Sequence, residues 1–389
     1  MNTTAVIGAC FGDEGKGLVT DALCDEDTAV VRHNGGAQAG HTVRFGEERF
    51  VFHQLGSGSF RGAATVWAES FLPDLFKLWD EYLAFKEVSG SAPKIYACPD
   101  TAVTLIDDVL VNMALETSRG AARHGSCGMG INEADLRTKA GFGVAMADLW
   151  GFGAERLFRR MAEIRREYLP KRLAALGLAA SGEYGELLKE ESVLRRAAEE
   201  MCRNADKTAP LADLSPYGSI VFEGAQGLLL DSENTRFAPH VTASRTGLDE
   251  PLKFCRRHGL VLDRAVYVTR SYLTRHGAGP LPHECSPDEI GSISPDRTNL
   301  PNPWQGSIRY APHTSPEFFA EAVSRDLKGR RPPAAVLAVT HLNETAGSLR
   351  FISGDIPAAD LPAHPVFAEL FDGYYTSFAD SGLAPLKGH

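Results

Sequence analysis

The start of the chain places strong limits on its fold. Residues 4–10 form a short apolar run, residues 12–17 a glycine-rich turn, and residues 16–23 have the composition of a helix. A strand that leads through a tight glycine turn into a helix is how doubly wound α/β sheets begin. A second apolar run at 29–31 leads into another glycine-rich turn at 34–42. The sequence therefore predicts an α/β fold built on a sheet.

The rest of the chain continues this alternation. Apolar and β-branched runs predict strands, and apolar residues at helical spacing predict helices. The predicted strands are 28–32, 51–53, 94–97, 219–222, 265–269 and 334–339, and the predicted helices are 72–86 and 103–118. Residues 149–205 are rich in Arg, Glu, Leu and Ala, and we expect a helical subdomain there with a glycine-rich break near 177–185.

Two segments lack a clear period. Residues 119–147 are glycine-rich and are expected to be irregular. Residues 276–316 contain eight prolines. A loop of that length in a compact protein is more often functional than idle, so we expect it to take part in the site.

Charge and cysteine content narrow the classes of function. The net charge of −10 at pH 7 argues against broad binding to nucleic acid or anionic lipid. Seven cysteines without a C-x-x-C pair predict neither a disulfide framework nor a zinc site. There is no basic leader and no apolar run of membrane-spanning length. We expect a cytoplasmic protein that binds neither membrane nor nucleic acid.

The first glycine turn has the chemistry of an anion site. Gly12, Gly15 and Gly17 allow close approach of the backbone to an anion, amides at the helix start point toward it, and Lys16 adds a positive charge. The turn is not the usual G-x-x-x-x-G-K-[ST] loop, because the chain has Cys10 and Gly17 at the defining positions. Asp13 is a candidate base or Mg²⁺ ligand, although most loop aspartates only cap turns.

Two further segments carry candidate groups. His41 follows the second glycine turn, where a histidine at neutral pH can hydrogen-bond a transferring phosphoryl oxygen. In residues 221–227 a strand ends in Glu223, and Gln226 follows it. An amide both donates and accepts, so Gln226 suits a carbonyl-bearing heterocycle.

Together these segments resemble the adenylosuccinate synthetase family. The motifs are G-D-E-G-K-G at 12–17 and G-G-x-x-A-G-H-T at 35–42, followed by 219–227, 241–242 and 272–280 with Glu284. The resemblance implies a single α/β domain over residues 1–389, with a central, mostly parallel, P-loop-related sheet plus helical and loop excursions. It also implies a homodimer, Mg²⁺ and a nucleoside triphosphate.

The resemblance also implies a reaction in two steps. The 6-oxygen of a purine nucleotide is phosphorylated, and the amine of L-aspartate then displaces phosphate. Asp13 matches the catalytic base, which also binds Mg²⁺, and Gly40 matches the carbonyl ligand of the metal. His41 matches the acid that stabilises the transferring phosphoryl group, and Gln226 matches the residue on the purine side.

Binding positions follow from the same resemblance. Gly12, Gly15, Lys16, Gly17 and Thr42 fall where the triphosphate is held. Gln38 replaces a family asparagine near the purine. Ser126, Cys127 and Thr242 fall where hydroxyl residues hold the nucleotide 5′-phosphate, and Cys127 lacks that hydroxyl.

Two stretches depart from the family pattern. Guanine selection in the family uses a T-K-x-D segment, and this chain has Asn343 in place of the aspartate. An amide cannot replace a carboxylate that accepts two hydrogen bonds, so the triphosphate is expected to be GTP or ATP.

The second departure is the aspartate-binding loop. The family's arginine-rich sequence is replaced by 298–309, whose T-N-x-x-N-x-x-Q-G-x-x-R pattern resembles phage 2-aminoadenylosuccinate synthetases, which act on dGMP. That branch usually lacks Asp13, which this chain retains. Candidate amino-acid-binding residues are Arg275, Asn302, Gln305 and Arg309, and either arginine can equally form a structural ion pair.

The resemblance therefore predicts a ligase that joins L-aspartate to C6 of IMP or (d)GMP. Alternatives are the same activation chemistry with another amino donor or acceptor, a nucleotide-binding regulator without ligase activity, and a generic P-loop NTPase.

Overall fold

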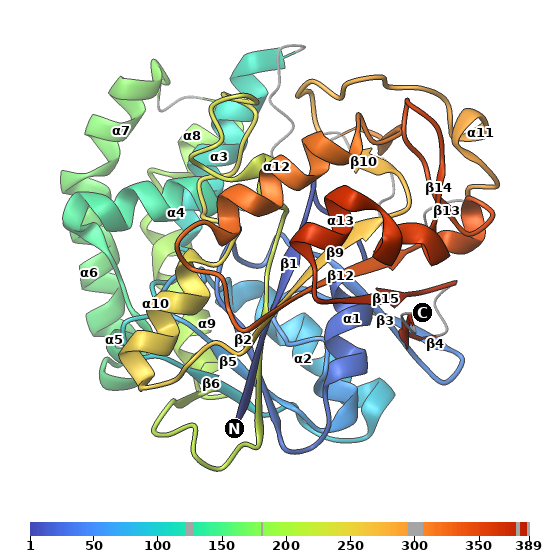
Figure 1. Ribbon diagram of the computed structural model, residues 1–389. Coiled ribbons are helices and arrows are strands. Elements are labelled where there is room, and N and C mark those ends of the chain that lie inside the picture. The colour runs from blue at the N-terminus through green and yellow to red at the C-terminus, as the bar shows by residue number, and fades with distance from the viewer. Residues whose placement is uncertain (121–127, 180–181, 295–305, 379–381, 387–389) are drawn as a thin grey trace.

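A parallel β-sheet runs through the centre of the protein. The computed structural model describes residues 1–120, 128–179, 182–294, 306–378 and 382–386. Ten strands lie in the order β16-β15-β12-β9-β1-β8-β2-β5-β6-β7, and every neighbouring pair is parallel except β15 with β16 (Figure 1). Their bounds are β1 (Asn2–Gly8), β2 (Thr28–Arg32), β5 (Ala64–Trp67), β6 (Ile95–Ala97), β7 (Ala209–Pro210), β8 (Ser219–Glu223), β9 (Arg264–Arg270), β12 (Ala334–Thr340), β15 (Gly373–Thr376) and β16 (Ala384–Pro385).

The central strands are apolar because both of their faces are covered. β1 is buried along all but its first residue, and β2 is buried throughout. Strands of this kind appear in sequence as continuous apolar runs. β1 pairs with β8 on one side and β9 on the other, with Val6 opposite Glu223 and Gly8 opposite Val268. The carboxyl ends of these strands therefore meet at one edge of the sheet.

Helices and small hairpins surround this sheet. The helices are α1 (Lys16–Leu23), α2 (Leu75–Ser89), α3 (Ile106–Arg119), α4 (Ile131–Arg137), α5 (Met146–Gly151), α6 (Ala154–Glu167), α7 (Leu169–Leu176), α8 (Gly182–Leu187), α9 (Glu191–Ala205), α10 (Asp249–His258), α11 (Pro287–Ile290), α12 (Pro316–Leu327) and α13 (Pro365–Leu370). The hairpins pair β3 (His41–Phe45) with β4 (Glu48–Phe52), β10 (Leu273–Arg275) with β11 (Arg309–Ala311), and β13 (Ser348–Leu349) with β14 (Ile356–Pro357).

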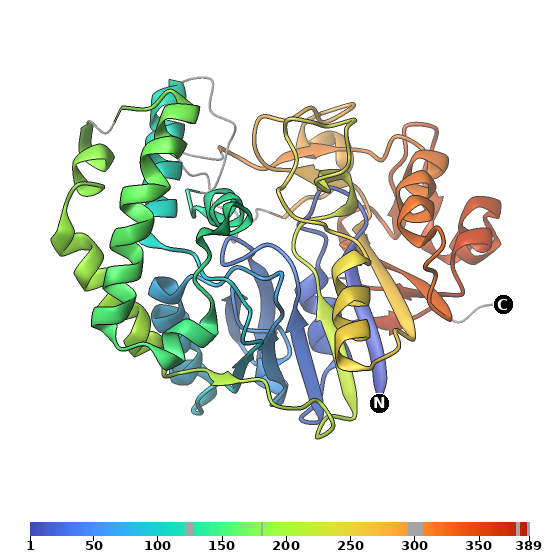
Figure 2. The ribbon, with the colours of Figure 1, turned by 90° about the vertical axis from the view of Figure 1, so that its left-hand side faces the viewer.

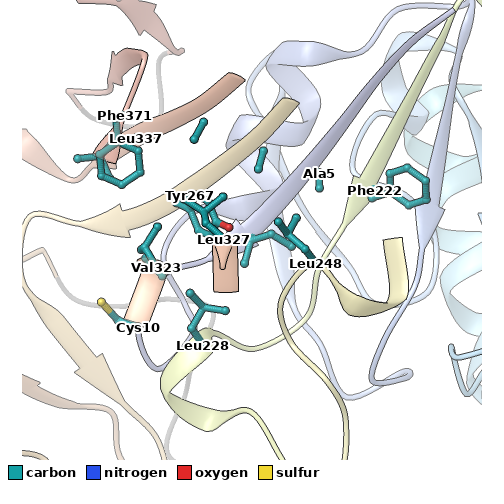
Figure 3. Packing of buried hydrophobic residues seen from close by; sticks show 14 of the residues in the cluster. Ala5, Cys10, Phe222, Leu228, Leu248, Tyr267, Val323, Leu327, Leu337 and Phe371 are labelled. Atoms are coloured by element: carbon teal, nitrogen blue, oxygen red, sulfur yellow. The ribbon is translucent and has the colours of Figure 1, made fainter. Parts of the chain in front are cut away.

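Two large hydrophobic clusters hold these layers together. One packs the sheet against α10, α12 and α13, and Figure 3 shows Phe222, Tyr267, Val323, Leu327 and Leu337 within it. The other joins α6 and α9 to α2 and to the strands β5 and β6. Figure 2 shows the helices α3 to α9, coloured teal to green, gathered at this end of the molecule. The helical region 149–205 thus shares its core with the sheet.

Most predicted elements are present, with three differences. Residues 119–147 are not wholly irregular, because α4 and a π-helical turn at Thr138–Phe142 lie within them. Gly130, with φ 72°, begins α4, so glycine there marks a helix start rather than a loop. The sheet strands β5, β7, β15 and β16 and the helices α10, α12 and α13 were not predicted, and the second glycine turn passes into β3 at His41. No helix in the described ranges has the length and apolar character needed to cross a bilayer.

Candidate active site

Three loops meet at the carboxyl edge of the sheet. They follow β1, β2 and β8, and they carry Asp13, His41 and Gln226. A Cβ atom on Gly17 would lie 2.9 Å from the Cβ of His41, and one on Gly12 would lie 3.6 Å from the Cα of Gln226. The first glycine turn therefore contacts both other loops. Residues predicted from separate motifs are brought together by this contact.

Backbone strain is concentrated here. Outside glycine, five described residues have a left-handed backbone, and Asp13 (φ 58°), Gln226 (φ 64°) and His341 (φ 59°) belong to this edge. Such conformations cost free energy in side chains larger than glycine and gather at functional sites. His341 immediately follows β12, and in the sheet β12 is separated from β1 only by β9.

Asp13 is held as a carboxylate. Its Oδ2 lies 3.0 Å from Nε2 of His276, and its backbone carbonyl accepts a 2.5 Å hydrogen bond from Nε of Arg270. Burial alone would raise the pKa of Asp13, but the His276 hydrogen bond and the charges of Arg270 and Lys16 outweigh it and lower the pKa to about 2. About a quarter of the side chain (27%) stays exposed, so a substrate can reach it.

His41 is paired with a buried carboxylate. Its Nδ1 lies 2.7 Å from Oε1 of Glu223. The hydroxyl of Ser57 donates to the same Oε1, and the backbone N–H of Ser57 donates to Oε2 at 3.0 Å. Burial raises the pKa of Glu223. The interactions of Glu223 with His41, Arg32 and Ser57 outweigh burial and lower this pKa to about 2. Burial lowers the pKa of His41, and Glu223 opposes that shift. We assign a Glu223 anion that orients the His41 ring and stabilises its imidazolium form.

Lys16 begins helix α1 beside this pair. Its Nζ lies 3.2 Å from Oε2 of Glu14, and both side chains are buried. Burial raises the pKa of Glu14, and Lys16 opposes that shift. The hydroxyl of Thr340 donates to the carbonyl of Glu14 at 2.8 Å, so the end of β12 supports the first glycine turn. A lysine and the amides of a helix start form a site for phosphate oxygens.

The second glycine turn is tied to the loop after β8. The amide of Asn34 donates to the carbonyls of Ala225 and Arg245 at 3.0 Å, and its oxygen accepts from the N–H of Ala225. Gln38 lies beside Gly35 and Gly36, and its buried Oε1 has no hydrogen-bond partner among the described residues. A buried acceptor in this state suits a ligand that donates a hydrogen bond.

The predicted metal ligands have the correct chemistry for Mg²⁺. The ion prefers oxygen ligands, and it usually takes one or two carboxylates with waters and phosphate oxygens. Asp13 supplies a partly exposed carboxylate, and exposed Gly40 supplies a carbonyl just before His41. Thr42 is half-buried in the β3–β4 hairpin, 3.5 Å from the Arg49 guanidinium.

The segment after β12 places Asn343 on the surface. Asn343 is exposed within the short helix Leu342–Glu344, whereas His341 is largely buried. Burial and the charge of Arg270 lower the pKa of His341 well below its usual value, with Asp13 opposing, so the ring is neutral. The triphosphate-binding prediction for Asn343 is not tested by this placement.

Arg275 and Arg309 face each other in the β10–β11 hairpin. The terminal nitrogens of Arg275 donate to the carbonyls of Pro280 and His240 at 2.6 and 2.7 Å, and its guanidinium lies over Phe11. Burial and the nearby Arg309 lower its pKa to about 10.

Arg309 pairs with Glu284 at 2.7 Å and donates to the carbonyls of Gly277 and Gly279. In this structure both arginines hold the loop at 277–284, which is the structural alternative raised from the sequence. Their amino-acid-binding role stays a prediction.

The structure leaves five predicted binding residues untested. Ser126, Cys127, Asn302 and Gln305 lie outside the described residues. Thr242 is half-buried, and its N–H donates to the carbonyl of Leu230 at 2.8 Å. The nucleotide-binding predictions for Ser126, Cys127 and Thr242 and the amino-acid-binding predictions for Asn302 and Gln305 therefore stay predictions.

Four groups of this site were given no role from the sequence. They are Ser57, Glu223, Arg270 and His276. Glu223 and Arg270 are the last residues of β8 and β9, and a charged residue that ends a buried strand was an available signal. Ser57 and His276 carry no pattern of their own, because only the fold brings them to Glu223 and Asp13.

Comparison with known proteins gives one family. The family model for adenylosuccinate synthetase matches residues 5–298. The adenylosuccinate synthetase of Pseudomonas paraeruginosa is 33% identical over 305 residues, and that of Azotobacter vinelandii is 31% identical over 296. Each match covers 74% of this chain and 66% of the relative, so the chain spans slightly less than two thirds of their length.

Solved structures agree on the fold. Adenylosuccinate synthetase from Plasmodium falciparum aligns with a TM-score of 0.62 at 18% identity, over 88% of this chain and 77% of that one. The succinoaminodeoxyadenylate synthetase of cyanophage S-2L, bound to dGMP and to dATP as an energy donor, aligns with a TM-score of 0.60 at 16% identity, over 100% and 96%. From the matched residues and the shared fold, the chain belongs to the adenylosuccinate synthetase family.

Proposed function

We propose that this protein is a Mg²⁺- and nucleoside-triphosphate-dependent ligase that joins the amine of L-aspartate to C6 of a 6-oxopurine nucleotide. One observation carries the proposal. The ionised Asp13, the His41–Glu223 pair and Gln226 meet at the start of helix α1, where Lys16 lies. Phosphorylation of a purine oxygen requires a base that accepts a proton, an acid held in a fixed orientation and a site for the phosphate anion. Asp13, His41 and Lys16 can supply these three functions.

In the first step the purine 6-oxygen attacks the γ-phosphorus of the triphosphate. The N1 proton passes to the Asp13 carboxylate, a 6-phosphoryl purine forms, and the nucleoside diphosphate leaves. His41, held through Nδ1 by Glu223, donates from its other ring nitrogen to the transferring phosphoryl group. The negative charge of a bound triphosphate favours the imidazolium form that this donation needs.

In the second step the amine of aspartate attacks C6 and the 6-phosphate leaves as inorganic phosphate. The nitrogen loses a proton, and the product is an adenylosuccinate or its 2-amino form. Gln226 contacts the purine, and Gln38 lies close to that side with an unpaired acceptor. Mg²⁺, held by Asp13 and Gly40, would neutralise charge on the phosphate oxygens.

The purine acceptor is IMP or (d)GMP. Retention of Asp13 favours IMP, and the 298–309 sequence favours (d)GMP. The cyanophage protein of similar fold binds dGMP and dATP, which supports testing the deoxynucleotide and ATP-type donors. We further propose that the protein acts as a homodimer in the cytoplasm, independent of nucleic acid and membrane.

The test is a matrix of IMP, GMP and dGMP against ATP and GTP, with Mg²⁺ and L-aspartate, read by mass spectrometry. We expect an aspartate adduct of one acceptor, with one phosphate released per adduct. Release of phosphate without an adduct would favour another amino donor or acceptor. Binding of nucleotides without turnover in any combination would contradict the ligase and favour a regulator.

Triphosphate choice has its own test. Asn343→Asp restores a carboxylate that accepts from guanine N1–H and the 2-amino group. We expect the ratio of kcat/KM for GTP over ATP to rise by about 10-fold, because one charge-assisted hydrogen bond contributes roughly 1–2 kcal/mol. An unchanged ratio would remove Asn343 from the triphosphate site.

A further inference from the structure

A second cluster of polar side chains lies apart from the site described above. Glu69 follows strand β5, Cys98 directly follows strand β6, and His258 is the last residue of helix α10. These groups come from three elements that are distant in the sequence. The proposed ligase reaction uses none of them.

The ligand atoms of this cluster are spaced as a metal site requires. Sγ of Cys98 lies 3.9 Å from Nε2 of His258, and that nitrogen lies 3.7 Å from Oε1 of Glu69. All three atoms lie within 4.8 Å of one another. A tetrahedral zinc ion, with bonds of about 2.3 Å to sulfur and about 2.0 Å to nitrogen and oxygen, separates its ligand atoms by roughly 3.3–3.6 Å. Closing the Cys98–His258 and His258–Glu69 gaps takes only a few tenths of an ångström.

Each of the three groups is held in place by its surroundings. The His258 ring stacks on Phe254 with centroids 4.1 Å apart, and Phe254 packs on Phe222 of β8. Cys98 is buried, and its N–H donates to the carbonyl of Trp67 at 2.9 Å. Preorganised ligands lower the ordering cost of metal binding.

The carboxylate of Glu69 is shielded from water and faces the other two groups. Its Oε1 lies 3.7 Å from Nε2 of His258 and 3.0 Å from Nε of Arg257, and the Cys98 thiol lies against the same carboxylate. Arg257 also pairs with Asp100 at 2.5 Å. Arg257 thus keeps a partner when a cation binds Glu69.

We propose that Glu69, Cys98 and His258 bind one divalent transition-metal ion of the zinc class, with water as the fourth ligand. A thiolate and an imidazole select such an ion over Mg²⁺ and Ca²⁺, which prefer oxygen ligands. Binding releases the Cys98 proton to solvent, and the thiolate and carboxylate then balance the charge of the ion.

The metal would connect the sheet edge to α10 and stabilise one wall of the active site. The segment after β5 contacts the second glycine turn, since the N–H of Leu72 donates to the carbonyl of Gly35 at 2.9 Å and the hydroxyl of Ser70 donates to the carbonyl of His33. The three ligands are brought together only in the folded protein. A metal that binds them therefore stabilises the folded state and raises the unfolding temperature.

The test uses the full chain, stripped of metal under reducing conditions and titrated with Co²⁺ in excess Mg²⁺. We expect a cobalt–thiolate charge-transfer band that saturates at one ion per chain and is displaced by Zn²⁺. Cys98→Ser should abolish the band and weaken Zn²⁺ binding by about 100-fold or more, and His258→Gln should weaken it similarly. Cys202→Ser, which removes a half-buried thiol elsewhere, should change neither.

The unfolding temperature gives a second readout that does not depend on ligase activity. Zn²⁺ should raise it by several degrees in the unaltered chain and in Cys202→Ser, and should not raise it in His258→Gln. Absence of the charge-transfer band in the unaltered chain, or its persistence in Cys98→Ser, would overturn the proposal. If Cys98→Ser fails to fold, the comparison of His258→Gln with Cys202→Ser decides.

Discussion

The glycine-loop cluster (Asp13, Lys16, His41, Glu223 and Gln226) and the β10–β11 hairpin use charge in different ways. In the cluster, Asp13 is partly exposed and the His41–Glu223 pair leaves one ring nitrogen for a ligand. In the hairpin, the terminal nitrogens of Arg275 already donate to backbone carbonyls. The comparison teaches that a charged residue in the correct motif position can serve a substrate when the fold leaves part of it exposed or one of its polar atoms free, as at Asp13 and His41.

The largest expected effect is on Asp13. Asp13→Asn keeps the shape and removes the proton acceptor, so we expect turnover to fall on the order of 10³-fold or more. The unfolding temperature should fall modestly but the variant should stay folded, because asparagine keeps the shape while the attraction of the carboxylate to His276, Arg270 and Lys16 is lost. Single-turnover assays beside thermal unfolding check this. Full turnover in the variant would show that Asp13 is not the base.

For Arg275 we expect a loss of stability rather than of turnover, because its contacts hold a loop. Arg275→Ala leaves two carbonyls and a buried ring contact without a partner, so the free energy of unfolding should fall by about 3 kcal/mol. Arg309→Ala, at a more exposed side chain, should cost about 1 kcal/mol. Chemical denaturation measures both. A stable Arg275→Ala variant with a raised KM for aspartate would instead support amino-acid binding.

Glu223 connects the two kinds of effect. Glu223→Gln keeps the shape but removes the charge that favours imidazolium at His41, so we expect kcat to fall by about 10²-fold and the pH optimum to move to lower pH. Ser57→Ala removes one hydrogen bond and keeps the carboxylate charge, which makes it the matched control. Equal losses and an unmoved pH optimum in both variants would argue against a charge effect.

The last prediction concerns stability against pH. Burial, with the charge of Arg32, lowers the pKa of His33 to about 3, so the folded protein holds this ring neutral. The unfolded chain, with a pKa near 6.5, binds the proton first. Stability is therefore present above pH 6.5 and is lost as pH falls toward 3, by up to about 1.4 kcal/mol per pH unit.

His33→Leu should reduce the slope of unfolding free energy between pH 6.5 and 5. The two proteins should show the same slope at pH 8, where the ring is neutral in both states. Denaturant titrations at these pH values provide the measurement. An unchanged slope between pH 6.5 and 5 would assign the pH dependence to other groups.

The elements nearest the glycine turns were predicted well. The predicted helix at 16–23 and strand at 28–32 coincide with α1 and β2, because a buried parallel strand and a glycine-started helix leave strong local patterns. The strand β5 has only four residues and was not predicted, although the equally short β6 was; strands of this length carry too few residues for their period to decide. Glycine at 130 and 141 concealed the helical turns between 131 and 142.

The proposed metal cluster marks the limit of spacing arguments. Absence of a C-x-x-C pair predicted no zinc site, but Glu69, Cys98 and His258 are brought together from three elements by the sheet and α10. Ligands that do not share a turn or a helix leave no spacing to recognise. Only their positions in the fold show the cluster.

The sequence by itself determined the α/β class and the two glycine turns, because glycine turns at strand ends are fixed by local backbone chemistry, and it singled out Asp13, Lys16, His41 and Gln226 as candidate site residues. The tertiary structure decided which partners these groups have. Glu223 orients His41. Asp13 is held as an anion by His276 and Arg270, and Arg275 holds a loop. Partnership depends on which strand ends become neighbours, and residues far apart in sequence meet only when the whole sheet has formed.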